Sequence, residues 1–279
     1  MANVHKKKIS FSRILIYAIL ALFMLWTIIP VYIVVTNSFK PTLQIKEIPP
    51  VFFFQPTLTH YEKVLGGGEF GSYFVNSLII ASITTVISVL GGALGAYGLT
   101  LSQSRWATRA SNIMLLGKLV PAIAILIPFY TILKTVHLNG SYIGPILAHC
   151  SVNLPFVVWL MMSFMSDIPR ELYESSCLDG ATRMQTFWKI IFPILLPAIG
   201  SAVILSMQYS WNELVYSLQL TNMSSYTLPV GIGRFVGSVS VDWGKSSAAA
   251  SITMVPIIIV GFLMQKYLVS GLTAGAVKE

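Results

Sequence analysis

The chain has 279 residues, of which 55% are hydrophobic and only 10% are charged, and its mean hydropathy is +0.75. A soluble domain has roughly a quarter of its residues charged, so these proportions exclude an ordinary soluble protein and place the chain in a bilayer. The net charge of +8 does not indicate a nucleic-acid-binding domain, because the Lys and Arg residues fall in short segments between apolar runs.

Six apolar windows are long enough to cross a hydrocarbon core, which takes about 20 helical residues. These windows are residues 14–35, 74–99, 113–133, 143–165, 191–210 and 249–268. The sequence therefore predicts an all-α integral membrane protein with six transmembrane helices. The first window is longer than the apolar core of about 7 to 15 residues in a signal peptide, so we expect a retained anchor.

Positive charge indicates how these helices are oriented. With the amino terminus inside, eleven Lys and Arg residues lie in cytoplasmic segments and six in external ones, as the positive-inside rule favours. We expect one transmembrane domain over residues 1–279, with both termini cytoplasmic. Its expected cytoplasmic segments are 1–13, 166–190 and 269–279, and its expected external loops, rich in Pro or Gly, are 36–73 and 219–247.

Small residues and prolines mark the spans. Gly91 and Gly95 stand four residues apart in the second window, with Gly98 near its end, so we expect a neighbouring helix to approach closely there. Several spans are interrupted by prolines, which free backbone groups that neighbours or cavity water must satisfy: Pro121, Pro128, Pro155, Pro197 and Pro256.

A charged segment with a helical pattern lies between the fourth and fifth windows. Pro169 suits the first turn of a helix, and Asp179-Gly180 supplies a turn that ends it before a second short helix. From composition alone this is either an ordinary polar connector or a site where a partner docks and transmits force.

A family resemblance favours docking. Residues 174–181 read Glu-Ser-Ser-Cys-Leu-Asp-Gly-Ala and are followed by Phe187, Ile190, Pro193 and Pro197. This pattern resembles the EAA loop of permease subunits in ATP-binding-cassette importers. The segment 265–278, together with Asn76-Ser77 and Trp211-Asn212-Glu213, is similar to the maltose-permease branch, which imports carbohydrates. One departure is that Ser175 and Ser176 replace the two alanines for which the loop is named; they are still small but are polar.

The resemblance implies a type I importer permease fold in a prokaryotic plasma (inner) membrane, with residues 166–190 as the cytoplasmic EAA loop. It also implies four kinds of partner: a second homologous permease subunit, two ATP-binding subunits, an extracytoplasmic solute-binding protein and membrane lipids, with no nucleic acid. In the loop we expect Glu174 to face the ATPase and Gly180 to set the turn. The expected coupling residues are Leu172, Glu174, Ser175, Ser176, Leu178, Asp179 and Gly180.

Polar side chains at membrane depth are the next candidates, since they cost free energy unless they are paired or hydrated. Aromatic and amide groups suit a sugar, although each such residue has the alternative role of an interhelical bond. Lys118 either snorkels to the inner interface or lines the cavity and indicates an anionic substrate. The expected substrate-path residues are Lys118, His149, Asn153, Gln208, Trp211 and Asn212, with Ser151 beside them.

No catalytic set of residues emerges. The four histidines are scattered, and Gly244-Lys245-Ser246 lacks the earlier glycine of a phosphate-binding loop, where Val239 stands. We therefore expect no enzyme activity, no metal site and no cofactor bound by this chain, with ATP and Mg on the partner ATPase subunits.

The expected function is that of the transmembrane subunit of an ATP-driven, binding-protein-dependent importer that moves a sugar or oligosaccharide by alternating access. One alternative is a related permease for a polyol phosphate, a sugar acid or a polyamine. The other is an ion-driven secondary transporter, which should show buried acidic residues and inverted repeats.

Overall fold

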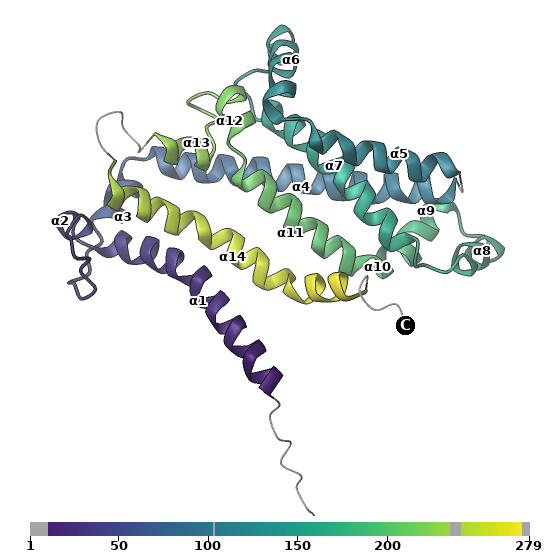
Figure 1. Ribbon diagram of the computed structural model, residues 1–279. Helices are drawn as coiled ribbons and strands as arrows, with labels where there is room; N and C mark the ends of the chain where they lie inside the picture. Colours follow the sequence, from purple (N-terminus) through teal and green to yellow (C-terminus); the bar gives the residue numbers. More distant parts are fainter. Residues whose placement is uncertain (1–10, 103, 235–240, 275–279) are drawn as a thin grey trace, which may run out of the picture. The chain divides into compact units, whose positions relative to one another are not determined.

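The computed structural model describes residues 11–102, 104–234 and 241–274. Within these ranges every regular element is a helix, which confirms the predicted all-α class (Figure 1). The longest helices are α1 (Phe11–Phe39), α4 (Glu69–Leu101), α7 (Ile143–Met165), α11 (Leu196–Asn212) and α14 (Trp243–Ala274). The shorter ones are α2 (Thr42–Ile45), α3 (Thr59–Gly66), α5 (Arg105–Leu116), α6 (Ala122–Thr135), α8 (Glu171–Leu178), α9 (Arg183–Thr186), α10 (Phe192–Ile194), α12 (Val215–Leu220) and α13 (Leu228–Gly233).

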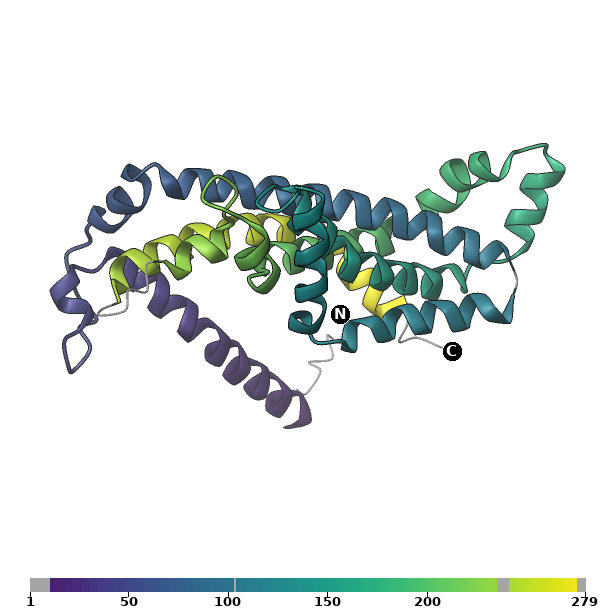
Figure 2. The same cartoon turned by 90° about the horizontal axis from the view of Figure 1, so that it is seen from above.

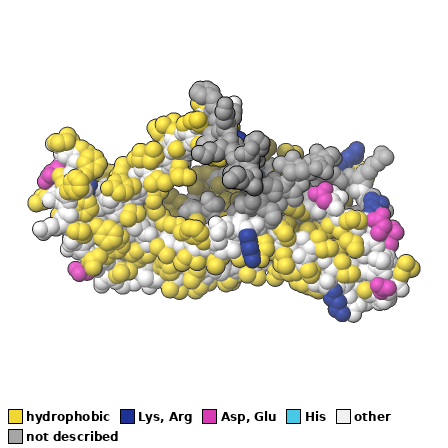
Figure 3. Space-filling view, turned by 90° about the horizontal axis from the view of Figure 1, so that it is seen from below, with side chains coloured by type: hydrophobic (Ala, Val, Ile, Leu, Met, Phe, Trp, Pro, Cys, Tyr) yellow, Lys and Arg dark blue, Asp and Glu magenta, His cyan; other side chains and the backbone are white. Residues whose placement is uncertain are grey.

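Four helices are each long and apolar enough to cross a membrane: α1, α4, α7 and α14. The fourth predicted window, 143–165, coincides with α7, and the first, second and sixth lie inside longer helices. On the face drawn in Figure 3, hydrophobic side chains cover most of the described surface, and charged side chains are scattered among them. This surface suits contact with lipid.

The third and fifth windows are not the continuous helices that the sequence predicts. A bend of 94° separates Arg109–Leu119, which ends in a 3-10 turn, from α6, and a bend of 78° separates Arg183–Ile194 from α11. Prolines explain both breaks. Val120 is extended before Pro121, as a residue preceding proline prefers, and Pro197 has no N–H to donate to the carbonyl four residues back. Six spans result only if each bent pair crosses the membrane.

The two predicted external loops contain more helix than expected. Within 36–73 lie α2 and α3, and α4 already begins at Glu69. Within 219–247 lie the end of α12, all of α13 and the first turn of α14. The prolines and glycines of these loops therefore separate short helices; they do not abolish helical structure.

The chain forms two compact units, one from the described residues up to 66 and between 241 and 252, the other from the described residues 67–234 and 253–274. In the first unit, α1 and α3 are joined by a hydrogen bond of 2.8 Å between the hydroxyls of Ser38 and Tyr61. His60 of α3 bonds through Nε2 to the carbonyl of Lys40 at 2.8 Å.

The second unit is built around α4, α7 and α11, whose buried side chains form its main core. A Cβ at Gly92 would lie 2.6 Å from a side-chain carbon of Val157, so the backbone of α4 packs directly against this side chain of α7. At Gly91 and Gly95 the spacing is ordinary contact, and at Gly98 no atom lies within 4 Å. The expected close approach is present, but its centre is Gly92. In both views α5 runs along α7 (Figures 1 and 2).

Candidate functional site

The segment expected to couple to an ATPase forms a helix, a tight turn and a second helix. α8 begins two residues after Pro169 and is followed by Gly180, whose φ is +75°. The N–H of Gly180 bonds to the carbonyl of Cys177 at 3.1 Å, and the N–H of Ala181 bonds to that of Ser176 at 3.0 Å. These two bonds define a Schellman C-cap, so the turn predicted at Gly180 is present.

The second helix of this loop has its own start signal. Thr182 Oγ1 accepts the N–H of Gln185 at 3.3 Å, and Gln185 Oε1 accepts the N–H of Thr182 at 2.8 Å, which is a capping box. The buried hydroxyls of Ser176 and Thr186 lie 2.9 Å apart and join α8 to α9. The two helices of the loop are therefore held together as one element.

Tyr97, near the end of α4, anchors both halves of the loop. Its hydroxyl donates to the carbonyl of Arg183 at 2.8 Å, and its ring lies 5.1 Å from that of the buried Phe187 and 6.2 Å from that of Tyr173. Burial raises the pKa of the Tyr173 hydroxyl, so this group is a neutral hydrogen-bond donor at pH 7. These contacts connect both halves of the loop to a spanning helix.

The expected coupling residues divide into an exposed set and one buried residue. Leu178 is 89% exposed, and Leu172, Glu174, Ser175, Asp179 and Gly180 are also exposed. Ser176 is only 2% exposed and faces Thr186. Ser176 therefore belongs to the internal packing of the loop, while the other six residues are available to a partner.

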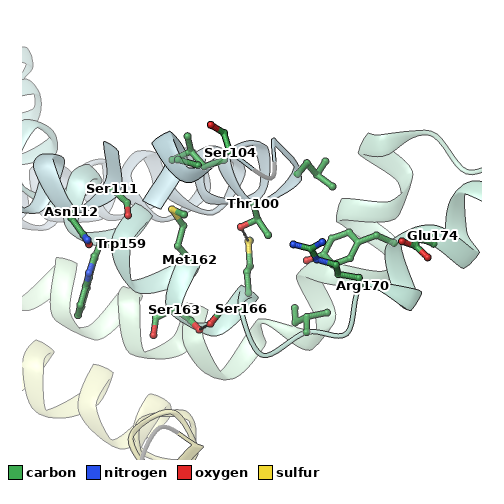
Figure 4. A pocket seen from close by; sticks show the side chains of 16 residues that line it. Thr100, Ser104, Ser111, Asn112, Trp159, Met162, Ser163, Ser166, Arg170 and Glu174 are labelled. Carbon is green, nitrogen blue, oxygen red and sulfur yellow. Dashed lines mark hydrogen bonds between the residues drawn. The ribbon is translucent and has the colours of Figure 1, made fainter. Parts of the chain in front are cut away.

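A cavity of about 580 Å³ opens beside the loop. It lies between the end of α4, α5, the end of α7 and the first turn of α8, and sequence reasoning did not indicate it. Figure 4 shows Arg170 extending toward the middle of this cavity, with Glu174 at its far edge. Hydroxyl and amide groups line much of the wall, including Thr100, Ser104, Asn112 and Ser166.

His149 is part of a buried polar cluster that joins α7 to the end of α11. Its Nε2 lies 3.0 Å from Glu213 Oε2, and its Nδ1 lies 2.7 Å from the Ser210 hydroxyl. Because a carboxylate only accepts, Nε2 carries the proton, and in the neutral ring Nδ1 accepts from Ser210. Of the two roles that the sequence left open for His149, the structure shows the interhelical bond, and the substrate-path role stays a prediction.

Glu213 completes this cluster; the sequence analysis named it only within Trp211-Asn212-Glu213 and not as a site residue. Besides His149, its carboxylate accepts the N–H groups of Tyr216 at 2.8 Å and Ser217 at 3.0 Å, and the Ser217 hydroxyl at 3.1 Å. Its carboxylate thus caps the start of α12 and also bonds to His149 of α7. An acidic residue just before a short helix was the available signal, but nothing in the sequence pairs it with a histidine 64 positions earlier.

The other expected path residues differ in their surroundings. Trp211 is buried and donates to the carbonyl of Thr253 at 3.2 Å, so it also holds helices together. Asn153 is 1% exposed, and its Nδ2 has no hydrogen-bond partner among the described residues. Gln208 and Asn212 are exposed one turn apart on α11, where Asn212 donates to the carbonyl of Gln208 at 2.9 Å. These two amides are available to a solute.

Lys118 lies in the 3-10 turn between α5 and α6, and so outside any straight spanning helix. Its Nζ is 3.9 Å from the centre of the Phe156 ring, and this cation–π contact offsets part of the cost of removing the charge from water. The two roles expected for Lys118, snorkelling to the inner interface and lining the substrate path, stay predictions.

The fold and the loop are those of a permease subunit. The family model described as "Binding-protein-dependent transport system inner membrane component" matches residues 87–274, and the chain belongs to this family. It is thus a multi-pass membrane subunit of an ATP-binding-cassette importer, and the family description ties its transport to a binding protein.

Two curated relatives cover nearly the whole chain. The trehalose transport system permease protein SugB of Mycobacterium tuberculosis is 32% identical over 91% of this chain and 93% of its own length. The diacetylchitobiose uptake system permease protein DasC of Streptomyces coelicolor is 32% identical over 90% of this chain and 92% of its own length. A chain of a bacterial ABC transporter that imports the acidic polysaccharide alginate has the same fold, with a TM-score of 0.78 at 20% identity over 94% of this chain and 99% of that one.

Proposed function

We propose that this chain is the transmembrane subunit of a carbohydrate importer and that residues 166–190 are its docking site for a cytoplasmic ATPase. The observation that supports coupling is the construction of the loop: two capped helices joined by the Ser176–Thr186 bond and anchored by Tyr97 to α4. A rigid exposed element attached to a spanning helix is what force transmission needs. ATP-driven movement of the loop then opens the bundle alternately to each side.

The carbohydrate assignment is supported by the relatives and by chemistry. The relatives named above transport trehalose and diacetylchitobiose according to their names. On this chain, the exposed amides of Gln208 and Asn212 offer donors and acceptors to the hydroxyls of a sugar. Glu213 gives little support to an ion-driven mechanism, since its carboxylate already accepts hydrogen bonds from His149 and from backbone N–H groups of α12.

The proposal includes the remaining subunits. A second homologous permease completes the pathway, and two ATP-binding subunits hold ATP and Mg, because this chain shows no phosphate-binding sequence. A solute-binding protein delivers the sugar; in a solved alginate transporter such a protein is present in its pentasaccharide-bound form. Both termini and the docking loop face the cytoplasm.

A charge reversal tests the docking role. Glu174→Lys should abolish ATP-dependent uptake in proteoliposomes that contain all subunits, because the exposed carboxylate of α8 would no longer pair with a basic group of the ATPase. Glu171→Lys, an equally exposed reversal three residues earlier, is the matched control and should transport normally. Normal uptake by the Glu174→Lys complex would refute the coupling assignment.

The solute class is tested separately. A deletion strain complemented with the wild-type chain should take up one or more labelled neutral disaccharides or oligosaccharides, whereas Gln208→Ala and Asn212→Ala together should reduce this uptake several-fold with unchanged membrane levels. Uptake restricted to a polyamine or a polyol phosphate would refute the carbohydrate assignment and leave the docking role intact.

A further inference from the structure

We propose that the cavity beside the docking loop holds a membrane phospholipid, with the phosphate group bound by Arg170. The cavity lies within one compact unit, between α4, α5, α7 and α8, and its volume of about 580 Å³ is in the range of ligand pockets. It lies at the end of spanning helices and is lined by both polar and apolar side chains, as an amphiphile requires.

Unused hydrogen-bond donors indicate an acceptor-rich ligand. Arg170 makes no ion pair or side-chain hydrogen bond with any residue that the structure describes, although its guanidinium extends into the cavity (Figure 4). The Tyr173 hydroxyl is buried and has no partner within the described chain. Ser104 accepts the N–H of Trp106 at 3.1 Å, which leaves its own hydroxyl proton free to donate. A guanidinium with hydroxyl donors beside it is suited to phosphate oxygens.

Apolar side chains form part of the wall, which favours a lipid over a soluble phosphate. Leu99, Trp159 and Met162 line it, and these side chains suit the glycerol backbone and the first carbons of an acyl chain. The side chains next to the cavity on α5 are of a kind found at membrane interfaces. On α5, Trp106 is 70% exposed, and the guanidinium carbon of Arg109 lies 5.1 Å from the centre of its ring. Such a pair of side chains is typical of the headgroup region. The lining carries Arg170 together with Glu174, and a pocket between helices that presents a basic side chain at this level is a known setting for lipid headgroups.

Photocrosslinking on the full-length chain in inner-membrane vesicles tests this proposal. Phosphatidylglycerol and phosphatidylethanolamine that carry a diazirine near the glycerol should label peptides within residues 159–174, whereas diacylglycerol with the same diazirine should not. Arg170→Gln should lower this labelling about tenfold, as expected for the loss of a charge-assisted bond. Arg170→Lys should retain part of it.

Lys189→Gln is the matched control, since it removes one exposed positive charge from the same loop without touching the cavity. Ser163→Phe, which narrows the cavity from an exposed position, should also reduce labelling and provides a second variant. Equal labelling by diacylglycerol, an equal loss in Lys189→Gln, or full competition by glycerol 3-phosphate would each overturn the lipid assignment. This readout requires no transported solute, so it stands or fails separately from the importer function.

Discussion

Gly180 has a backbone conformation that other residues adopt at a cost. Its φ of +75° costs a residue with a Cβ about 1–2 kcal/mol, although a Cβ there would meet no atom within 4 Å. Gly180→Val should therefore reduce ATP-dependent uptake several-fold through backbone strain alone, while insertion is unchanged. Gly180→Asn should retain most of the uptake, because Asn tolerates the left-handed region. Uptake at matched membrane levels measures both, and equal uptake by the two variants would contradict the need for this turn.

Glu213 accepts four hydrogen bonds from three residues, so its removal affects two helices. Glu213→Ala leaves His149 without its acceptor and two backbone N–H groups of α12 unpaired, and should lower the free energy of unfolding by about 3–5 kcal/mol. Glu213→Gln keeps one acceptor oxygen and should cost less. Thermal unfolding in detergent is the measurement, with Asn212→Ala as an exposed neighbouring control. Similar midpoints for Glu213→Ala and Asn212→Ala would contradict the structural role.

Individual residues differed in how well the sequence predicted them. Gly180 was predictable, because the Asp-Gly pair follows a helical pattern and the left-handed turn is a local property. The pairing of His149 with Glu213 was not, because it depends on how α7 and α11 pack across 64 positions of sequence. For the same reason the sequence did not specify that Trp211 donates to the backbone carbonyl of Thr253, and its place on the substrate path stays a prediction.

At the scale of elements, hydropathy located the apolar segments but not their breaks. A window average is nearly unaffected by one proline, whereas a missing N–H and an extended preceding residue suffice to end a helix. The windows 113–133 and 191–210 are therefore bent at Pro121 and near Pro197. The cavity beside α8 was likewise unpredictable, since its wall is drawn from four helices that are separated in sequence.

The contact between α4 and α7 depends on a glycine that the spacing pattern did not select. A Cβ at Gly92 would lie 2.6 Å and 2.7 Å from side-chain carbons of Val157 and 3.2 Å from the backbone nitrogen of Val158. Gly92→Ala should therefore destabilise the chain by about 1–3 kcal/mol through overpacking. Gly98→Ala, on the same helix with nothing within 4 Å, is the control and should be neutral or slightly stabilising. Thermal unfolding of the two variants in detergent decides, and equal midpoints would contradict this packing.

At the scale of the whole molecule, the path of the bent helix pair α5–α6, which precedes α7, decides on which side of the membrane the docking loop lies. If both pairs cross the membrane there are six spans, and if both are re-entrant there are four. Both even numbers place the termini on one side, so the termini do not distinguish them. The loop after α7 does: with cytoplasmic termini it is cytoplasmic in the six-span arrangement and external in the four-span arrangement.

The native cysteines make this difference measurable. Cys177 is exposed in the docking loop and Cys150 is buried in α7, so an impermeant maleimide should report on Cys177 alone. We expect Cys177 in spheroplasts to react only after permeabilisation, because an ATPase reaches the loop only from the cytoplasm. In a Cys177→Ser background, Gly66→Cys should react from outside, since Gly66 ends α3 in the first predicted external loop. Labelling of Cys177 in intact spheroplasts would place the loop outside. This result would refute both the crossing of the membrane by α5–α6 and the proposed docking of an ATPase.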